Sequence, residues 1–170
     1  MSANKKPKVA IVMGSDSDFP VLKPCIKVLK QFDVEVEVHV ISAHRTPDRA
    51  EKFARNADAN GIDIIIGAAG KAAHLPGVLA AFTTLPVIGL PIKSSTMDGL
   101  DSLLSIVQMP KGIPVATVAI DGSDNAGILA VQMLSIGYPE LKTKLQAFKI
   151  EMANQVIEKD AMIKEEVSKI

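Results

Sequence analysis

The chain has 170 residues, of which 48% are hydrophobic and 22% are charged, as in an ordinary globular protein. At this length a single domain buries roughly 68–70% of the surface of its unfolded chain, which provides a core without disulfide or metal staples. The 19 basic and 19 acidic residues cancel, which excludes a basic field that would hold nucleic acid non-specifically.

Cysteine content and hydropathy indicate the cellular compartment of the protein. The single cysteine, Cys25, excludes an intramolecular disulfide, and its place inside a predicted helix favours a core residue over a nucleophile. The polar stretch Met1–Lys8 lacks the apolar core of a signal peptide, and no apolar run is long enough to span a bilayer. We therefore expect a cytoplasmic protein that does not contact a membrane.

Five short apolar segments alternate with helical patterns. The predicted strands are Val9–Met13, Val34–Ile41, Ile62–Ala68, Pro86–Leu90 and Pro114–Ile120. Four of them are nearly continuous apolar runs, as expected for strands buried on both faces of a parallel sheet. The second alternates valine with glutamate and histidine, which predicts an edge strand with one wetter face. We expect His39, on that face, to be a solvated surface residue.

Helices are predicted at 18–31, 47–60, 75–83, 99–109 and 125–136. Repeated strand–helix units with short connections predict an α/β fold, a parallel sheet covered by helices on both faces. No linker divides the chain, so we expect one domain over 1–170, with its sheet core at about 8–137. If the strand order is 2-1-3-4-5, a ligand crevice opens at the carboxyl ends of strands one and three, with the loop after strand two alongside.

A long extra helix is predicted at 139–170. Its apolar residues recur at spacings of three and four and form a stripe. The stripe consists of Leu141, Leu145, Phe148, Met152 and Val156. Either this stripe packs on another subunit, or the helix folds back over its own domain.

The hexapeptide Ser42–Pro47 lies between the second strand and the next helix. It places an imidazole, which exchanges protons near neutral pH, beside a guanidinium, which binds phosphate or carboxylate. Thr46 is expected to N-cap the helix, and Pro47 suits its first turn. Because a helix N-terminus attracts anions, His44 and Arg45 are either site residues on a stiff loop or merely polar capping residues.

The loop after the first strand, Gly14–Asp18, reads Gly-Ser-Asp-Ser-Asp. Its glycine allows a tight turn, and its hydroxyls lie beside the free N–H groups of the next helix, which suits a phosphate or a hydroxyl ligand. The loop matches neither a Walker loop nor a dinucleotide fingerprint. Since Asp16 and Asp18 would repel a phosphate, at least one should face a sugar hydroxyl or cap the helix.

The loop after the third strand, Gly67–Gly77, contains a run of small residues that leaves the backbone open to a ligand. His74 ends this run. A lone histidine is more often a packing residue than a catalyst, but His44 and His74 follow strands that are expected to lie close together. The two loops are therefore predicted to bring two histidines to one pocket.

Several familiar site types are absent from the sequence. There are no paired carboxylates at glycosidase-like positions, no zinc motif, and no G-x-S-x-G nucleophile elbow. What remains is a small polar pocket of serine, aspartate, arginine and histidine with exposed backbone. Such a pocket suits proton transfer on a small phosphorylated molecule.

In these motifs the sequence resembles the N(5)-carboxyaminoimidazole ribonucleotide mutase family of bacterial purine synthesis. The segments that match are Met13–Asp18, Ser42–Pro47, Ala72–Gly77, Pro86–Gly89, Asp101–Pro110 and Gly112–Thr117. They follow one another in order, and the match extends from about Lys8 to Leu134.

The resemblance implies a flavodoxin-like three-layer α/β/α fold and a homo-octamer with active sites shared between subunits. It also implies transfer of carbon dioxide from the exocyclic nitrogen of an aminoimidazole ribonucleotide to the neighbouring ring carbon, without ATP, metal, biotin or another cofactor. In that mechanism the carbamate loses carbon dioxide inside a closed site, the ring carbon captures the trapped gas, and a histidine transfers the proton.

Position by position, the resemblance assigns the proton transfer to His44. Ser15, Asp18 and Arg45 resemble the ribose-phosphate contacts. The residues that resemble the wall around the carboxyl group are Gly70, Ala72, Ala73, His74 and Leu75. The remaining expected substrate-binding residues are Gly14, Ser17, Ser42, Ala43 and Lys71.

Two positions depart from the family pattern, because Ala68 and Lys71 stand where the family usually has glycine. If position 71 requires a positive φ, a lysine there is strained. Alternatively, the ammonium of Lys71 reaches toward the phosphate or carboxylate of the substrate.

Two other functions compete with the mutase. One is a related carboxylase that uses free carbon dioxide on aminoimidazole ribonucleotide. The other is a non-catalytic nucleotide-binding or assembly module, since folds of this kind host both. The segments Arg45–Pro47 and Ala72–Gly77 favour the mutase over the carboxylase, and a binding module would not need His44.

Overall fold

The computed structural model describes residues 5–170 and contains a five-stranded parallel sheet. The strands are β1 (Lys8–Met13), β2 (Glu35–Val40), β3 (Ile64–Gly70), β4 (Val87–Ile92) and β5 (Ala116–Thr117). Their order is β2-β1-β3-β4-β5. The predicted fold class and strand order are confirmed, and the carboxyl ends of β1 and β3 lie at the point where the strand order reverses.

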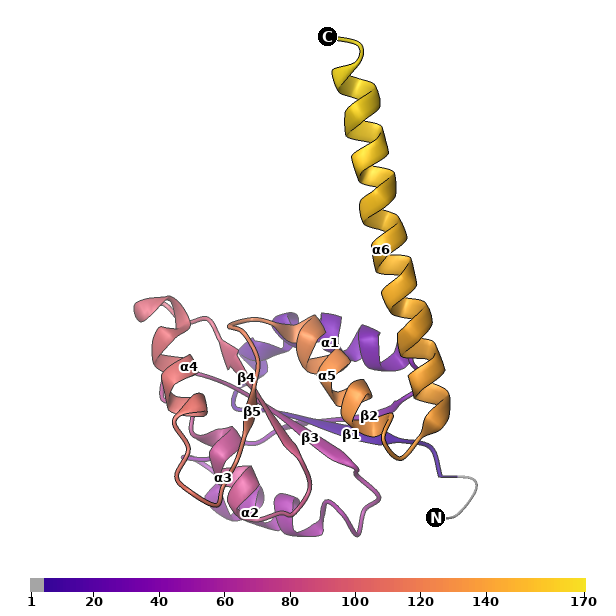
Figure 1. Cartoon of the computed structure of the whole chain (residues 1–170). Coiled ribbons are helices and arrows are strands. Elements are labelled where there is room, and N and C mark those ends of the chain that lie inside the picture. Colours follow the sequence, from indigo (N-terminus) through magenta and orange to yellow (C-terminus); the bar gives the residue numbers. More distant parts are fainter. Residues whose placement is uncertain (1–4) are drawn as a thin grey trace.

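Helices cover both faces of the sheet, with α1 and α5 on one side and α2, α3 and α4 on the other (Figure 1). The α-helices are α1 (Phe19–Gln31), α2 (Pro47–Asn56), α3 (Leu75–Ala81), α4 (Leu100–Val107), α5 (Ser123–Leu134) and α6 (Pro139–Val167). Two short 3₁₀ helices, η1 (Asp16–Asp18) and η2 (Met97–Gly99), precede α1 and α4. Each face of the sheet therefore has its own apolar core.

Close packing of α4 on the sheet depends on a small residue. A Cβ atom at Gly89 of β4 would lie 2.3 Å from Cγ2 of Ile106, so α4 approaches the sheet only because a side chain is missing there.

On the other face of the sheet Cys25 is fully buried, and burial raises the pKa of its thiol to about 12. Cys25 is a core residue, as predicted.

The two edge strands differ in part from the prediction. β2 is an edge strand as expected, but His39 is half-buried rather than solvated, because its ring packs 4.9 Å from the ring of Phe53 in α2 and contacts Glu37. On the opposite face Val38 and Val40 are 39% and 46% exposed, whereas Val36 packs against the core. β5 was predicted over Pro114–Ile120 but forms only two residues, because a regular ladder to β4 exists only there.

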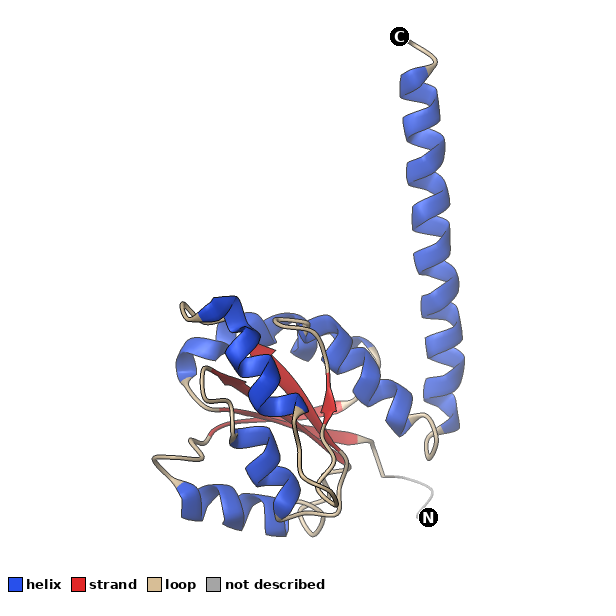
Figure 2. Cartoon of the chain, turned by 60° about the vertical axis from the view of Figure 1, so that its left-hand side comes forward, coloured by secondary structure: helices blue, strands red, loops and turns tan. Residues whose placement is uncertain are grey.

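The C-terminal helix α6 leaves the body of the molecule and extends away from it as a single long rod (Figures 1 and 2). Its first turns pack on the domain: Leu141 is buried, and the Phe148 ring lies 5.7 Å from that of Phe32. Farther along, Met152 and Val156 are 44% and 66% exposed. The predicted stripe therefore divides into a part that covers its own domain and a part that nothing within residues 5–170 covers. No helix within residues 5–170 is both long and apolar enough to cross a membrane.

Candidate active site

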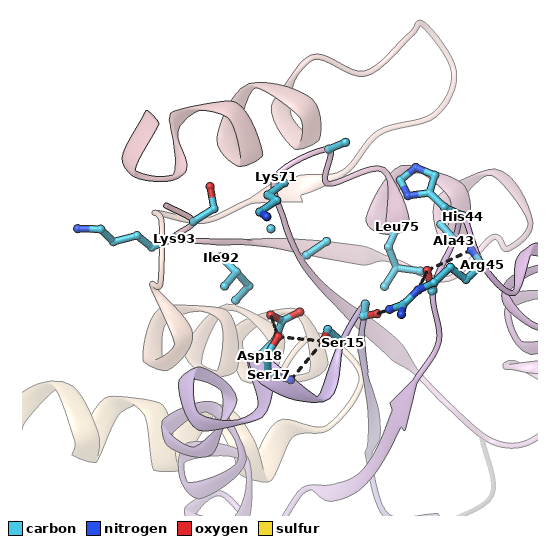
Figure 3. A pocket seen from close by; sticks show the side chains of 16 residues that line it. Ser15, Ser17, Asp18, Ala43, His44, Arg45, Lys71, Leu75, Ile92 and Lys93 are labelled. Carbon is cyan, nitrogen blue, oxygen red and sulfur yellow. Dashed lines mark hydrogen bonds between the residues drawn. The ribbon is translucent and has the colours of Figure 1, made fainter. Parts of the chain in front are cut away.

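A cavity of about 570 Å³ lies where the loops after β1, β2, β3 and β4 meet (Figure 3). Its lining comes from four separate segments of the chain. The lining residues are Gly14, Ser15, Ser17, Asp18, Ser42, Ala43, His44, Arg45, Ala69, Gly70, Lys71, Ala72, Leu75, Ile92, Lys93 and Ser94.

Most of the residues predicted from the sequence meet in this cavity, and two do not line it. The side chain of Ala73 is fully buried in the core beneath α2 and α3, so it does not form part of the wall. His74 contacts His44 but is not one of the residues that line the cavity. Sequence reasoning missed Ala69 and the whole contribution of β4, which is Ile92, Lys93 and Ser94. Their position at the carboxyl end of a strand beside β3 was the available signal.

The loop between β2 and α2 is fixed by its own hydrogen bonds. Thr46 stands at the N-cap position, but its hydroxyl does not cap the helix as predicted. Instead it donates to the carbonyl of Ser42 at 2.9 Å and accepts from the Ser42 N–H at 3.1 Å. Pro47 begins α2, as predicted. The result is a closed five-residue loop that presents His44 and Arg45 to solvent on a stiff base.

Arg45 is held by two neighbouring loops. Its Nη2 donates to the carbonyl of Gly14 at 3.3 Å, and its Nε donates to Oγ of Ser42 at 3.4 Å. Figure 3 shows the guanidinium along one side of the cavity. The remaining N–H groups of the fork are available to an oxyanion, and a guanidinium suits two-point binding of phosphate or carboxylate.

The loop after β1 presents two hydroxyls and a buried carboxyl group. Oγ of Ser15 accepts from the N–H and the hydroxyl of Ser17, at 3.3 Å and 2.9 Å. Asp18 is only 8% exposed. Burial raises the pKa of this carboxyl group, although a backbone hydrogen bond to Ser15 and a side-chain bond to Ser17 act in the opposite direction. A carboxyl group of this kind is suited to accept a hydrogen bond from a sugar hydroxyl.

The two histidines predicted to converge are in direct contact. Nε2 of His44 lies 2.8 Å from Nδ1 of His74, and the rings are nearly perpendicular, at 82°. One nitrogen of this pair must donate and the other accept, so the contact fixes the tautomer of each ring relative to the other. The second nitrogen of His44 is thereby left for proton exchange with a ligand.

The run of small residues after β3 serves packing as well as access. A Cβ atom at Gly67 would lie 3.0 Å from Cα of Pro76, so this glycine allows α3 to lie directly on the strand. Ala68 is fully buried within β3 and its φ is negative, so alanine fits at that position without strain. Lys71 has a φ of 56°, which lies in the left-handed region that disfavours lysine.

Positive charge exceeds negative charge in the cavity. Among its lining residues in the described chain, Arg45, Lys71 and Lys93 are cations and Asp18 is the one carboxylate. Nζ of Lys93 lies 3.3 Å from Oδ1 of Asp98, so this ammonium is partly neutralised. The described lining thus carries more positive than negative side chains, which suits an anionic ligand. Within residues 5–170 no three His, Cys, Asp or Glu side chains come together in a way that would hold a metal ion.

The known proteins that resemble this chain agree with the geometry of the cavity. The family model described as AIR carboxylase matches residues 8–155. The chain is 63% identical over 146 residues to the N5-carboxyaminoimidazole ribonucleotide mutase of Pyrococcus abyssi, covering 86% of this chain and 84% of that one. It is 54% identical over 159 residues to the phosphoribosylaminoimidazole carboxylase of Candida glabrata, covering 94% of this chain and 28% of that one.

A solved structure supports the same relationship at the level of the fold. The crystal structure of PurE from Treponema denticola superimposes with a TM-score of 0.84 and 28% sequence identity, over 92% of this chain and 98% of that one. The matched family model spans every element that lines the cavity. The chain is a member of the AIR carboxylase family.

Proposed function

We propose that the protein is an N5-carboxyaminoimidazole ribonucleotide mutase of purine synthesis. It moves the carboxyl group from the exocyclic nitrogen to the ring carbon and produces 4-carboxy-5-aminoimidazole ribonucleotide. The observation that supports this most strongly is the cavity at the strand ends, in which a proton-exchanging imidazole lies beside a guanidinium. High identity over most of the chain to proteins named as mutases supports the same conclusion.

His44 is the proton carrier in this proposal. When the bond between nitrogen and the carboxyl carbon breaks, carbon dioxide leaves and the nitrogen takes a proton from His44. The ring carbon then bonds to the trapped carbon dioxide, and its own proton returns to His44. One histidine therefore completes the cycle, because each turnover gives away one proton and recovers one. General acid–base help of this kind is worth roughly 10²–10⁴-fold in rate.

The remaining lining residues hold the ribonucleotide in place. Arg45, with Ser15 and Ser42 beside it, binds the phosphate, and Asp18 accepts a hydrogen bond from the ribose. The backbone from Gly70 to Leu75 lies along the carboxyl group. A fixed ring carbon next to trapped carbon dioxide gains the effective concentration that orientation provides. No cofactor is required by this chemistry.

The assembly is part of the proposal. Trapping carbon dioxide requires a closed site, yet His44, Arg45 and Lys71 are all exposed in the single chain. The uncovered half of α6 supplies apolar surface that soluble proteins normally bury. We infer a homo-octamer in the cytoplasm, in which α6 packs on another subunit and neighbouring chains complete each cavity.

The competing functions make different predictions. A carboxylase would take its carboxyl carbon from free carbon dioxide, and one relative named as a carboxylase is as similar as several mutases are. However, the chain covers 97% of one of these mutases and only 28% of that carboxylase, which favours the mutase. The source of the carboxyl carbon separates the two functions directly. A binding module would hold the ribonucleotide and leave it unchanged.

The first experiment asks whether the protein converts the carbamate at all. Purified protein is given N5-carboxyaminoimidazole ribonucleotide without ATP, and the 4-carboxy product is followed by absorbance against a protein-free control. We expect rapid formation of product in the presence of the protein only. Ligand binding in a calorimetric titration without any product would contradict the mutase and favour a binding module.

A further inference from the structure

Lys71 is the one cation of the cavity lining whose position costs backbone strain. Its φ of 56° lies in the left-handed region, where a residue with a Cβ atom is unfavourable and a glycine is not. Residues held in such conformations concentrate at functional sites, because the strain persists only where the surrounding structure compensates for it. The neighbours Gly70 and Ala72 are small, so no side chain next to it crowds the lysine.

The ammonium of Lys71 is free to bind a ligand. Within residues 5–170 no hydrogen bond or ion pair holds it, whereas the other lysine of the cavity, Lys93, pairs with Asp98. Figure 3 shows the Lys71 side chain extending into the cavity, while that of Lys93 points away from its centre. The cavity thus contains two cations directed at a ligand, Arg45 on one side and Lys71 on another.

The position of His44 indicates which end of the ligand lies near Lys71. The reacting carbon must lie within reach of His44, and His44 contacts His74 at 2.8 Å. His74 closes the same short loop that begins at Lys71, directly after β3. The reacting end of the ribonucleotide therefore lies against the Lys71 loop, and the phosphate lies toward Arg45 and the loop after β1.

We infer that Lys71 binds the carboxylate of the reacting end, and that it does so in preference to the phosphate. This inference rests on the proposed mutase function, since it assigns a partner to the group that moves. The ammonium would stabilise the carboxylated ribonucleotide before and after transfer. It would leave the ribonucleotide without a carboxyl group unaffected.

The test compares two ligands that differ only in the carboxyl group. Calorimetric titrations use 4-carboxy-5-aminoimidazole ribonucleotide and 5-aminoimidazole ribonucleotide, both of which contain the phosphate. In Lys71→Met and Lys71→Gly we expect affinity for the carboxylated ligand to fall by roughly 10- to 100-fold, as when a charged hydrogen bond is lost. Affinity for 5-aminoimidazole ribonucleotide should stay within about 2-fold of the wild-type value.

Further variants separate charge from strain. Lys71→Arg should retain the preference for the carboxylated ligand, and Lys52→Met, at an exposed position of α2 outside the cavity, should change nothing. Thermal unfolding should show Lys71→Gly as more stable than the wild type, because glycine relieves the positive φ, while Lys71→Met remains strained. Equal binding losses in the glycine and methionine variants then assign the effect to the lost charge.

Three results would overturn the inference. An equal loss of affinity for both ligands would mean that Lys71 binds the phosphate. Unchanged affinities would mean that Lys71 does not contact the ligand. A loss in the glycine variant alone would assign the effect to the backbone. Failure of the proposed function looks different, because the wild type itself would then neither prefer the carboxylated ligand nor convert the carbamate.

Discussion

The imidazoles of His44 and His74 form one hydrogen-bonded pair, so the tautomers of the two rings are linked. Two facing ring nitrogens 2.8 Å apart cannot both hold a proton. If one ring is fully protonated, the facing nitrogen of its partner must accept. We therefore propose that His74 influences proton transfer through this contact, while His44 exchanges the proton with the substrate.

This division predicts unequal effects of the same substitution. His44→Asn should lower kcat by roughly 10²–10⁴-fold, the contribution of a general acid–base group, and leave ribonucleotide binding largely intact. His74→Asn should cost less, because the asparagine amide can still bond to His44. Both are compared by kcat under saturating substrate. A much larger loss in the His74 variant would reverse the two roles.

The proposed phosphate contact of Arg45 depends on the shape of the guanidinium. Its fork bonds to Gly14 and Ser42 and still has N–H groups left for an oxyanion, which the single ammonium of a lysine cannot reproduce. Arg45→Lys should weaken ribonucleotide binding by roughly 10- to 100-fold in a calorimetric titration. Arg49→Lys, one helical turn away on α2 and outside the cavity, is the matched control. Unchanged affinity in the Arg45 variant would remove it from the site.

The buried carboxyl group of Asp18 predicts a pH-dependent stability. Burial raises its pKa in the folded state, because the neutral carboxyl group is buried more easily than the charged one. The free energy of unfolding therefore falls as pH rises from the unfolded pKa, about 3.9, through the raised folded pKa. Asp18→Asn remains neutral and should therefore be more stable than the wild type at pH 7. The gap in the free energy of unfolding should close as pH falls toward about 4.

Denaturant titrations between pH 4 and pH 7 measure this gap, with Asp58→Asn at an exposed position outside the cavity as the control. A gap that widens toward acid would mean that the Asp18 carboxylate is stabilised rather than destabilised in the fold. The Asn variant should also bind the ribonucleotide more weakly, because an amide replaces an acceptor of the ribose hydroxyl.

At the scale of elements, the sequence predicted the strands that are buried on both faces and the helices between them. Continuous apolar runs identified β1, β3 and β4, because only a strand covered on both sides excludes polar residues. The length of β5 was overestimated, since an apolar run does not reveal where hydrogen bonding to its single neighbouring strand ends. At β2 the alternation showed an edge strand but not which face α2 would cover, and Phe53 packs on the polar face.

The site was predictable where a motif coincided with a strand end. The segments Gly14–Asp18 and Ser42–Pro47 meet as expected, because parallel strands place their following loops at one edge. The contribution of Lys93 was missed because the loop after β4 contains no recognisable motif. The hydroxyl of Thr46 was assigned to a helix cap, and its actual bonds to Ser42 depend on loop geometry that composition does not specify.

At the scale of the whole molecule, we propose that α6 connects the domain to an assembly. Its first part stabilises its own domain through Leu141, Leu145 and Phe148, whereas beyond residue 149 its apolar side chains are exposed. A chain cut after Lys149 should therefore remain folded and lose the higher oligomer, together with most activity. A chain cut before Pro139 should be less stable as well, because it also loses part of its own core.

Analytical ultracentrifugation and a turnover assay on both shortened chains test this prediction. If the chain cut after Lys149 still sediments like the full-length protein and retains full activity, the outer half of α6 is not an assembly contact. The contribution of the first part of α6 to the stability of its own domain is measured separately, as the difference in thermal stability between the two shortened chains.

The measurement that tests the central claim most directly follows the carboxyl carbon through one reaction. Unlabelled N5-carboxyaminoimidazole ribonucleotide is incubated with the protein, without ATP, in the presence of isotopically labelled bicarbonate, and the mass of the 4-carboxy product is determined. A mutase that traps its carbon dioxide predicts a product that retains the unlabelled carboxyl group. Extensive incorporation of the label would contradict the account and identify a carboxylase that uses free carbon dioxide.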